Sequence, residues 1–324
     1  MELSFKVFEH AAALIGRTPW DVSRDADLLF QAQAAAFRLY RHQPLIAAID
    51  HYNLVPEALG GIAAQPDGNG VPAITEPLLA SATELLRPRP LDACRDGRLP
   101  MILEVASRLK REFPEAEVAV PVDGPFSIAS ALVGFDQLLC DVAEDPDAVR
   151  SALRHLIAGQ VKLTEHAQAL GLGVAFAESA AGPPLLSPAS FRRVELPVLQ
   201  ELLGRMGEIM GHRIACLMGG DTVRILDALL ETGSPHLVCP HETDQVAFVK
   251  KLWDRPEIRV RINLHPGIIA RGSWEELRAE ADRVLAFARG RPNTLLGAGV
   301  LPYETRAENI FRLRDYIGLD HPPS

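Results

Sequence analysis

Residues 212–222 read HRIACLMGGDT, residues 237–244 read LVCPHETD, and residues 260–267 read VRINLHPG. Each stretch is a short apolar run that stops abruptly on residues able to bind a metal or move a proton. Such runs are typical of the strands of an α/β barrel, whose active sites are built at the C-terminal ends of the strands. We therefore expect the polar residues that end these runs to share one site.

The same alternation of apolar runs and helical stretches extends through much of the chain. The predicted strands are 44–50 (PLIAAID), 116–126 (AEVAVPVDGPF), 173–179 (GVAFAES), 212–218 (HRIACLM), 236–242 (HLVCPHE), 257–266 (EIRVRINLHP) and 293–300 (NTLLGAGV). About six of these runs count as good strand candidates, so a further strand at 71–75 (VPAIT) and another in the early section would complete the eight strands of a barrel. Residues 3–16 and 25–43 have helical periodicity. The prediction is one barrel domain over residues 1–324 with an N-terminal helical extension.

The composition bounds the class of protein. Hydrophobic residues make up 48% and charged residues 23%, as in a globular protein with a substantial core. The net charge of −9 argues against a dedicated nucleic-acid binder. No apolar run is long enough to predict a membrane span, and MELSFKVFEH is not typical of a signal peptide. The four cysteines are too few and scattered for a disulfide framework, so we expect a cytoplasmic protein.

Polar residues at the predicted strand ends form the candidate site. They are Asp50, His51, Asp123, Glu178, Cys216, Met218, Cys239, His241, Glu242, Asn263 and His265. Two thiolates and an imidazole are good zinc ligands, and a catalytic zinc site uses three protein ligands with one position left open. The alternative for each cysteine is a small buried hydrophobe, and the alternative for Glu178 is a loop-capping residue.

Motifs spread along nearly the whole chain resemble those of the uroporphyrinogen decarboxylase superfamily, and more specifically its corrinoid-dependent methyltransferases. They are IDHYNLVPEALGG (49–61), VDGPFSIASALVGFDQLL (122–139), PDAVRSALRHL (146–156), ESAAGPPLLSPASFRRVELP (178–197), CLMGGDTVRIL (216–226), INLHPG (262–267) and LGAGVLPYETRAENI (296–310). The resemblance implies a (β/α)8 TIM barrel with its active site at the C-terminal mouth.

The chain also departs from this family. The decarboxylases carry an Arg-rich N-terminal segment that holds substrate carboxylates, and FKVFEHAAALIGRTPWDV (5–22) lacks that cluster. His51 falls where the essential Asp of the decarboxylases would be, so porphyrinogen decarboxylation is not expected.

The zinc methyltransferases of the superfamily carry His-x-Cys and a later Cys as ligands. The corresponding positions here are Cys216, Met218 and Ala298. Two outcomes follow: zinc has been lost, or the ligand set has moved to Cys216, Cys239 and a histidine, His265 or His241.

The first hypothesis is therefore a methyltransferase that moves a methyl group between a small substrate or a corrinoid and an acceptor such as a zinc-bound thiol. Its metal ligands would be Cys216, Cys239 and His265. Glu178, Asp123 and His241 would be catalytic, and Asp50, His51, Met218 and Asn263 would bind substrate. The corrinoid (cobalamin) would come free or on a partner protein, and a homodimer is a superfamily expectation.

Two other hypotheses remain open. One is a metal-independent lyase or decarboxylase that acts on a small carboxylated substrate, with acid–base catalysis by His51 or Asp50 together with His241 and Glu178. The other is a non-catalytic protein that binds a corrinoid or tetrapyrrole. The barrel alone cannot choose among them, because barrels host many chemistries.

Overall fold

Parallel strands form the inner layer of the structure, a computed structural model that describes residues 1–318. Hydrogen bonds join four strands in the order β1-β9-β8-β7 and three in the order β2-β5-β6. Their bounds are β1 Glu2–Lys6, β2 Leu45–Ile46, β5 Val118–Asp123, β6 Gly173–Ala177, β7 His236–Cys239, β8 Arg259–Asn263 and β9 Thr294–Val300. A parallel bridge between Ala177 and Leu217 adds one more position after β6. The chain thus visits eight parallel positions in order, as a (β/α)8 barrel does.

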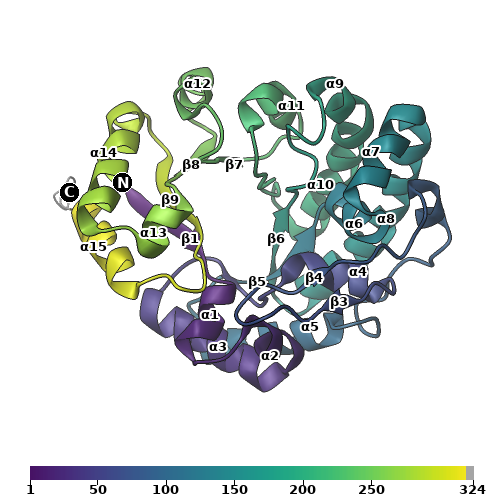
Figure 1. Cartoon of the computed structure of the whole chain (residues 1–324), viewed down its shortest axis with the longest axis horizontal. Coiled ribbons are helices and arrows are strands. Elements are labelled where there is room, and N and C mark those ends of the chain that lie inside the picture. Colours follow the sequence, from purple (N-terminus) through teal and green to yellow (C-terminus); the bar gives the residue numbers. More distant parts are fainter. Residues whose placement is uncertain (319–324) are drawn as a thin grey trace.

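Helices cover the outside of the strands (Figure 1). They are α1 Glu9–Leu14, α2 Pro19–Arg24, α3 Ala26–Tyr40, α4 Leu54–Ala58, α5 Leu99–Glu112, α6 Pro125–Val133, α7 Phe135–Glu144, α8 Pro146–Ala169, α9 Pro188–Ser190, α10 Leu196–Met210, α11 Leu226–Glu231, α12 Gln245–Lys251, α13 Pro266–Arg271, α14 Trp274–Ala288 and α15 Ala307–Gly318. A capping box starts α14, where Ser273 and Glu276 satisfy each other's backbone amides.

Three predicted elements differ in the structure. Glu2–Lys6 is a strand that pairs with β9, although its sequence has helical periodicity; the pairing with β9 outweighs the local preference. Ala73–Ile74 (β4) pairs antiparallel with Ala63–Ala64 (β3), outside the two barrel sheets. Only Leu217 of the stretch 212–218 joins a strand, through a single bridge, so this predicted strand is mostly irregular.

Side-chain parity divides each strand between two environments. On β8, Arg261 and Asn263 line a central cavity, whereas Val260 and Ile262 belong to the large core that faces the helices. A smaller apolar cluster of Phe8, Ile46, Ala48 and Ala119 is separate from that core. Residues one position apart on a strand therefore have different neighbours.

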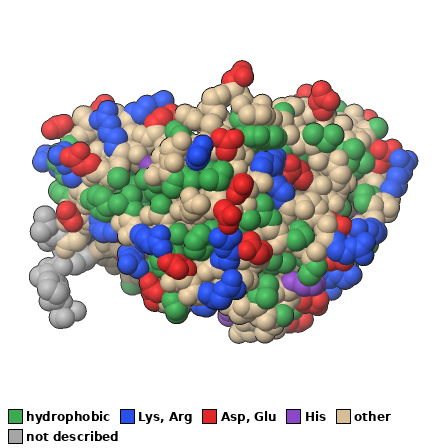
Figure 2. Space-filling model, turned by 90° about the horizontal axis from the view of Figure 1, so that it is seen from below, with side chains coloured by type: hydrophobic (Ala, Val, Ile, Leu, Met, Phe, Trp, Pro, Cys, Tyr) green, Lys and Arg blue, Asp and Glu red, His purple; other side chains and the backbone are tan. Residues whose placement is uncertain are grey.

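The surface mixes both signs of charge. On the face in Figure 2, Lys and Arg side chains alternate with Asp and Glu and do not gather into a basic field. Exposed ion pairs such as Arg41–Glu115 and Arg38–Glu112 are examples of this mixing. Within residues 1–318, no single helix is long and apolar enough to cross a membrane; α6 and α7, bent by 113°, pass on length and composition only as a pair.

Candidate active site

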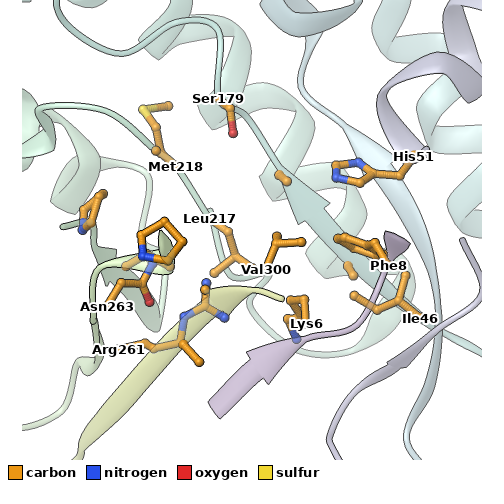
Figure 3. Close-up of a pocket in the computed structure, with 18 of the residues that line it drawn as sticks. Lys6, Phe8, Ile46, His51, Ser179, Leu217, Met218, Arg261, Asn263 and Val300 are labelled. Atoms are coloured by element: carbon orange, nitrogen blue, oxygen red, sulfur yellow. The ribbon is translucent and has the colours of Figure 1, made fainter. Parts of the chain in front are cut away.

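A cavity of about 270 Å³ lies at the C-terminal ends of the strands (Figure 3). Its apolar lining comes from Phe8, Ile46, Pro121, Ala175, Phe176, Ala177, Leu217, Met218, Val238, Pro240, Leu264, Pro266, Ala298 and Val300. Its polar lining comes from Lys6, His51, Tyr52, Ser179, His241, Glu242, Arg261 and Asn263. Of the predicted strand-end residues, the structure brings His51, Met218, His241, Glu242 and Asn263 together at this cavity.

His51 and Asp123 form a buried pair at one side of this cavity. His51 follows β2 and Asp123 ends β5, and their Nδ1 and Oδ1 atoms lie 2.8 Å apart. Burial raises the pKa of Asp123, while the hydrogen bond and charge of His51 oppose that rise. Because Asp123 occupies Nδ1, the other ring nitrogen, Nε2, is the one available to the cavity that His51 lines.

Tyr52 closes the cavity next to this pair. Its hydroxyl lies 2.8 Å from the Ser179 hydroxyl. Both residues also line a second hollow of about 470 Å³, which reaches Ile74 and Phe135. The Tyr52–Ser179 bond therefore stands between the two hollows.

The sequence patterns did not single out two basic side chains that line the cavity. Lys6 and Arg261 are 7% and 6% exposed, and the Nε and Nη1 atoms of Arg261 have no hydrogen-bond partner. Burial and the Arg261 charge lower the pKa of Lys6 to about 7, and burial lowers the pKa of Arg261 to about 10. Asn263 lies beside them with its Oδ1 buried and unpartnered.

A glycine on the neighbouring strand makes room for these side chains. A Cβ atom at Gly297 would lie 2.1 Å from Asn263 Oδ1 and 2.8 Å from Arg261 Cγ. Gly297 was the sequence signal that could have indicated these side chains, since a glycine inside a strand often marks a place where other atoms approach the backbone closely.

Glu178 faces away from the cavity, although its neighbours Ala177 and Ser179 line it. Its carboxylate accepts hydrogen bonds from the backbone amides of Phe126 and Ser127 at the start of α6 and from the Ser127 hydroxyl. A Cβ at Gly124 would lie 2.0 Å from Glu178 Oε2, so that turn requires glycine. These contacts are those expected if Glu178 is a loop-capping residue.

Glu195, just before α10, is buried next to Glu178. Neither of its oxygens has a hydrogen bond of standard geometry, and burial together with the charge of Glu178 raises its pKa well above the ordinary value. Burial likewise raises the pKa of Glu178.

The two cysteines expected to bind zinc do not reach the cavity. Cys216 and Cys239 are buried in the helix-facing core, while Leu217 and Val238 beside them line the cavity. Burial raises the pKa of both thiols. No group of three or more His, Cys, Asp or Glu in residues 1–318 could hold a metal ion. These residues do not fit the predicted zinc site.

His265 and His241 lie side by side, with ring centroids 4.8 Å apart. His265 caps α13, where its Nδ1 accepts a hydrogen bond from the Gly267 amide. His241 lines the cavity, and its Nδ1 lies 3.0 Å from Glu242 Oε2. His241 lines the cavity and His265 does not, so only His241 of this pair can contact a substrate there.

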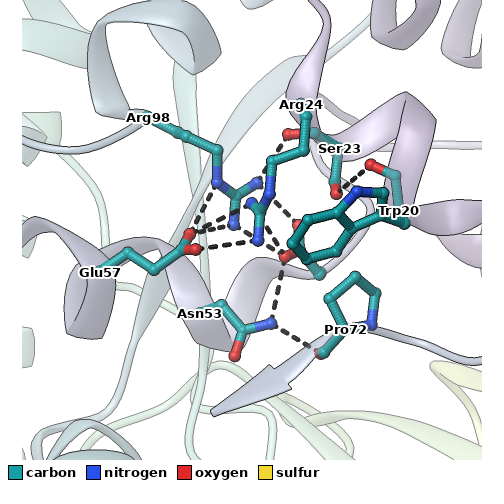
Figure 4. A network of polar contacts seen from close by, with 8 residues as sticks. Trp20, Ser23, Arg24, Asn53, Glu57, Pro72 and Arg98 are labelled. Atoms are coloured by element: carbon teal, nitrogen blue, oxygen red, sulfur yellow. Dashed lines mark hydrogen bonds and ion pairs between the residues drawn. The ribbon is translucent and has the colours of Figure 1, made fainter. Parts of the chain in front are cut away.

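Asp50 belongs to a separate polar network, whose members Arg98, Arg24, Asn53 and Glu57 are labelled in Figure 4. Its two oxygens accept hydrogen bonds of 2.8 and 2.7 Å from Arg98, and Asn53 donates to it as well. Arg98 and Arg24 both also pair with Glu57. Asp50 is not among the residues that line the cavity, so the structure does not place it with the other predicted substrate-binding residues.

Comparison with known proteins agrees with the fold and the motifs. Residues 6–318 match the family model described as uroporphyrinogen decarboxylase (URO-D). A uroporphyrinogen decarboxylase of Koribacter versatilis (strain Ellin345) is 30% identical over 137 residues, which span 41% of this chain and only 37% of that protein. A methyltransferase from Methanosarcina mazei has the same fold, with a TM-score of 0.81 and 18% identity, over 97% of this chain and 92% of that chain. The chain therefore belongs to the uroporphyrinogen decarboxylase family.

Proposed function

We propose that this protein is an acid–base enzyme of the lyase or decarboxylase type, which acts on a small carboxylated substrate in the barrel cavity without a protein-bound metal. The observation that carries the proposal is the buried His51–Asp123 pair at the wall of that cavity. Such a pair positions an imidazole for proton transfer, a contribution of about 10²–10⁴-fold in rate.

In this proposal Asp123 accepts a hydrogen bond from Nδ1–H of His51 and so fixes the ring and its tautomer. The Nε2 atom then exchanges a proton with the substrate. In a decarboxylation the C–CO2 bond breaks, CO2 leaves, and the electron pair left on carbon takes the proton from protonated His51. His241 lines the same cavity and is the second candidate for proton transfer.

Methyl transfer to a zinc-bound thiol has less support from the site. The cavity offers Met218 and Ala298 at the positions where the related methyltransferases carry ligands, and the alternative thiols face the core. The Methanosarcina protein, at 18% identity, supports the fold and not the reaction. A corrinoid supplied by a partner protein, binding without turnover, and a homodimer remain expectations of the superfamily resemblance.

The test is a screen of small carboxylic acids, including 2-oxo and 3-oxo acids, in D2O. Nuclear magnetic resonance would follow loss of CO2 or incorporation of deuterium into the product. We expect turnover that survives exhaustive chelation and is lost in His51→Asn. Turnover that requires added zinc, or that persists in His51→Asn, would contradict the proposal. The His166→Asn change on α8, at a residue that does not line the cavity, is the matched control.

A further inference from the structure

The lower wall of the cavity carries two cations without a counter-charge. Lys6 ends β1 and Arg261 lies on β8, and both line the cavity (Figure 3). Within residues 1–318, neither side chain has a hydrogen bond or an ion pair to a carboxylate. A buried charge left unpaired costs several kcal/mol, so such groups usually mark a site that a ligand completes.

The surrounding charges do not relieve this excess. Three charged groups influence the pKa of Lys6. Arg261 and Arg259 lower it, and Glu117 raises it by less than Arg261 lowers it. His42 and His236 are also within its influence, but burial lowers the pKa of each to about 3, so both are neutral. Glu117 lies at the exposed surface and does not pair with Lys6.

The polar atoms beside the two cations suit an anion at one end of a small molecule. Asn263 is adjacent to Arg261, on the same strand and the same face, so its amide can approach the same ligand. Ile46, Leu217 and Val300 supply apolar walls around this end (Figure 3). A planar guanidinium matches a carboxylate through two parallel hydrogen bonds.

We propose that Lys6 and Arg261 form the subsite that holds a carboxylate of a small organic acid, with Asn263 as a third hydrogen-bonding group. This inference rests on the proposed function for the reaction, which takes place at His51, and adds the anchor that fixes the substrate. The anchored carboxylate pairs with Arg261 and with the ammonium form of Lys6. The walls leave the remainder of the molecule in apolar surroundings that reach toward His51.

Anion binding is coupled to protonation of Lys6. Because the pKa of the free amine is about 7, a large share of it is neutral at pH 8. A bound carboxylate favours the ammonium form and raises that pKa. Binding at pH 8 therefore takes up a proton, and affinity falls as the pH rises above 7. Since His42 and His236 are already neutral at this pH, Lys6 is the group that accounts for this uptake.

The experiment is isothermal titration calorimetry of the full chain with butanoate, in two buffers of different ionisation enthalpy at pH 8. Inorganic phosphate is the second probe. We expect butanoate to bind with uptake of up to one proton and phosphate to bind more weakly. Arg261→Met should weaken butanoate by about 10–100-fold, the value of a lost charged hydrogen bond. Lys6→Met should remove the proton uptake. Arg261→Met should fold, because a similar apolar side chain replaces an unpaired buried charge.

His51→Asn separates this inference from the proposed function. We expect that variant to lose turnover and to keep butanoate affinity within about twofold. No butanoate binding by the wild type, preferred binding of phosphate, or unchanged butanoate binding in both Arg261→Met and Lys6→Met would overturn the subsite. Turnover could still depend on His51 in each of these cases.

Discussion

His51 Nδ1 lies 2.8 Å from Asp123 Oδ1, across 72 positions of sequence, and His51 faces the barrel cavity. We predict that Asp123→Asn lowers turnover by about 10²–10⁴-fold, because the imidazole loses the group that fixes its tautomer. The rate of deuterium incorporation into the product measures this. The far-ultraviolet circular dichroism of the variant checks that it folds. An Asp123→Asn protein with wild-type turnover would contradict the assignment.

Gly297→Ala tests the close packing behind the basic side chains. The added Cβ would lie 2.1 Å from Asn263 Oδ1, so we expect a loss of about 1–3 kcal/mol in the free energy of unfolding. Gly204→Ala is the matched control, because that helical glycine of α10 has no atom within 4 Å of its Cβ position. The control should gain up to about 1 kcal/mol from helix propensity. Urea unfolding compares the two.

The sequence predicted which segments build the site better than which side chains enter it. Strands β5, β6, β7, β8 and β9 fall within predicted stretches, and their C-terminal ends surround the cavity. The apolar runs could not predict which of two adjacent side chains points into the cavity. Leu217 and Val238 face the cavity, and the adjacent Cys216 and Cys239 face the helices. A shift of one residue moves a strand side chain to the opposite face.

The basic end of the cavity was missed for a related reason. Lys6 lies in a segment predicted as helical. In the structure that segment is strand β1, and its partner β9 is far away in the sequence. In VRINL (260–264), Arg261 is the polar residue of an alternating strand pattern, and polar residues in such a pattern normally face solvent. Both assignments depend on strand partners that are far away in sequence.

The core positions of the cysteines predict that zinc does not depend on them. Cys239→Ala should leave the metal content of the purified protein and its turnover unchanged, with a stability cost of about 1 kcal/mol. Elemental analysis of the wild type and the variant checks this. Stoichiometric zinc that is lost in Cys239→Ala would restore the first hypothesis and displace the lyase proposal.

The buried Glu178–Glu195 pair predicts a pH dependence of stability. Burial raises the pKa of Glu195 above its ordinary value of 4.5, so the folded protein holds this proton more tightly than the unfolded chain does. The contribution to stability is therefore fully present below pH 4.5 and is lost as the pH rises toward the raised pKa. Glu195→Gln should thus be more stable than the wild type at pH 8.

The gain from Glu195→Gln should shrink at pH 5, where the wild-type pair keeps its proton. Urea unfolding at pH 5 and pH 8 measures both differences. Glu201→Gln on α10 is the control, because Glu201 forms a surface pair with Arg154 and should change stability by less than about 1 kcal/mol at either pH. An equal gain at both pH values would show that the Glu195 proton is not involved.

Asp50→Asn separates a structural from a substrate-binding role for the residue after β2. Asp50 is buried in a two-bond pair with Arg98, so its neutral replacement leaves part of a buried positive charge unpaired and should cost about 3 kcal/mol. The exposed Arg41–Glu115 pair is the control, and Arg41→Gln should cost less than about 1 kcal/mol. If Asp50 instead bound substrate as the sequence suggested, the substrate KM would rise while the free energy of unfolding stayed near that of the wild type. Urea unfolding and KM measured on one preparation distinguish the two roles, because the first predicts loss of stability at an unchanged KM.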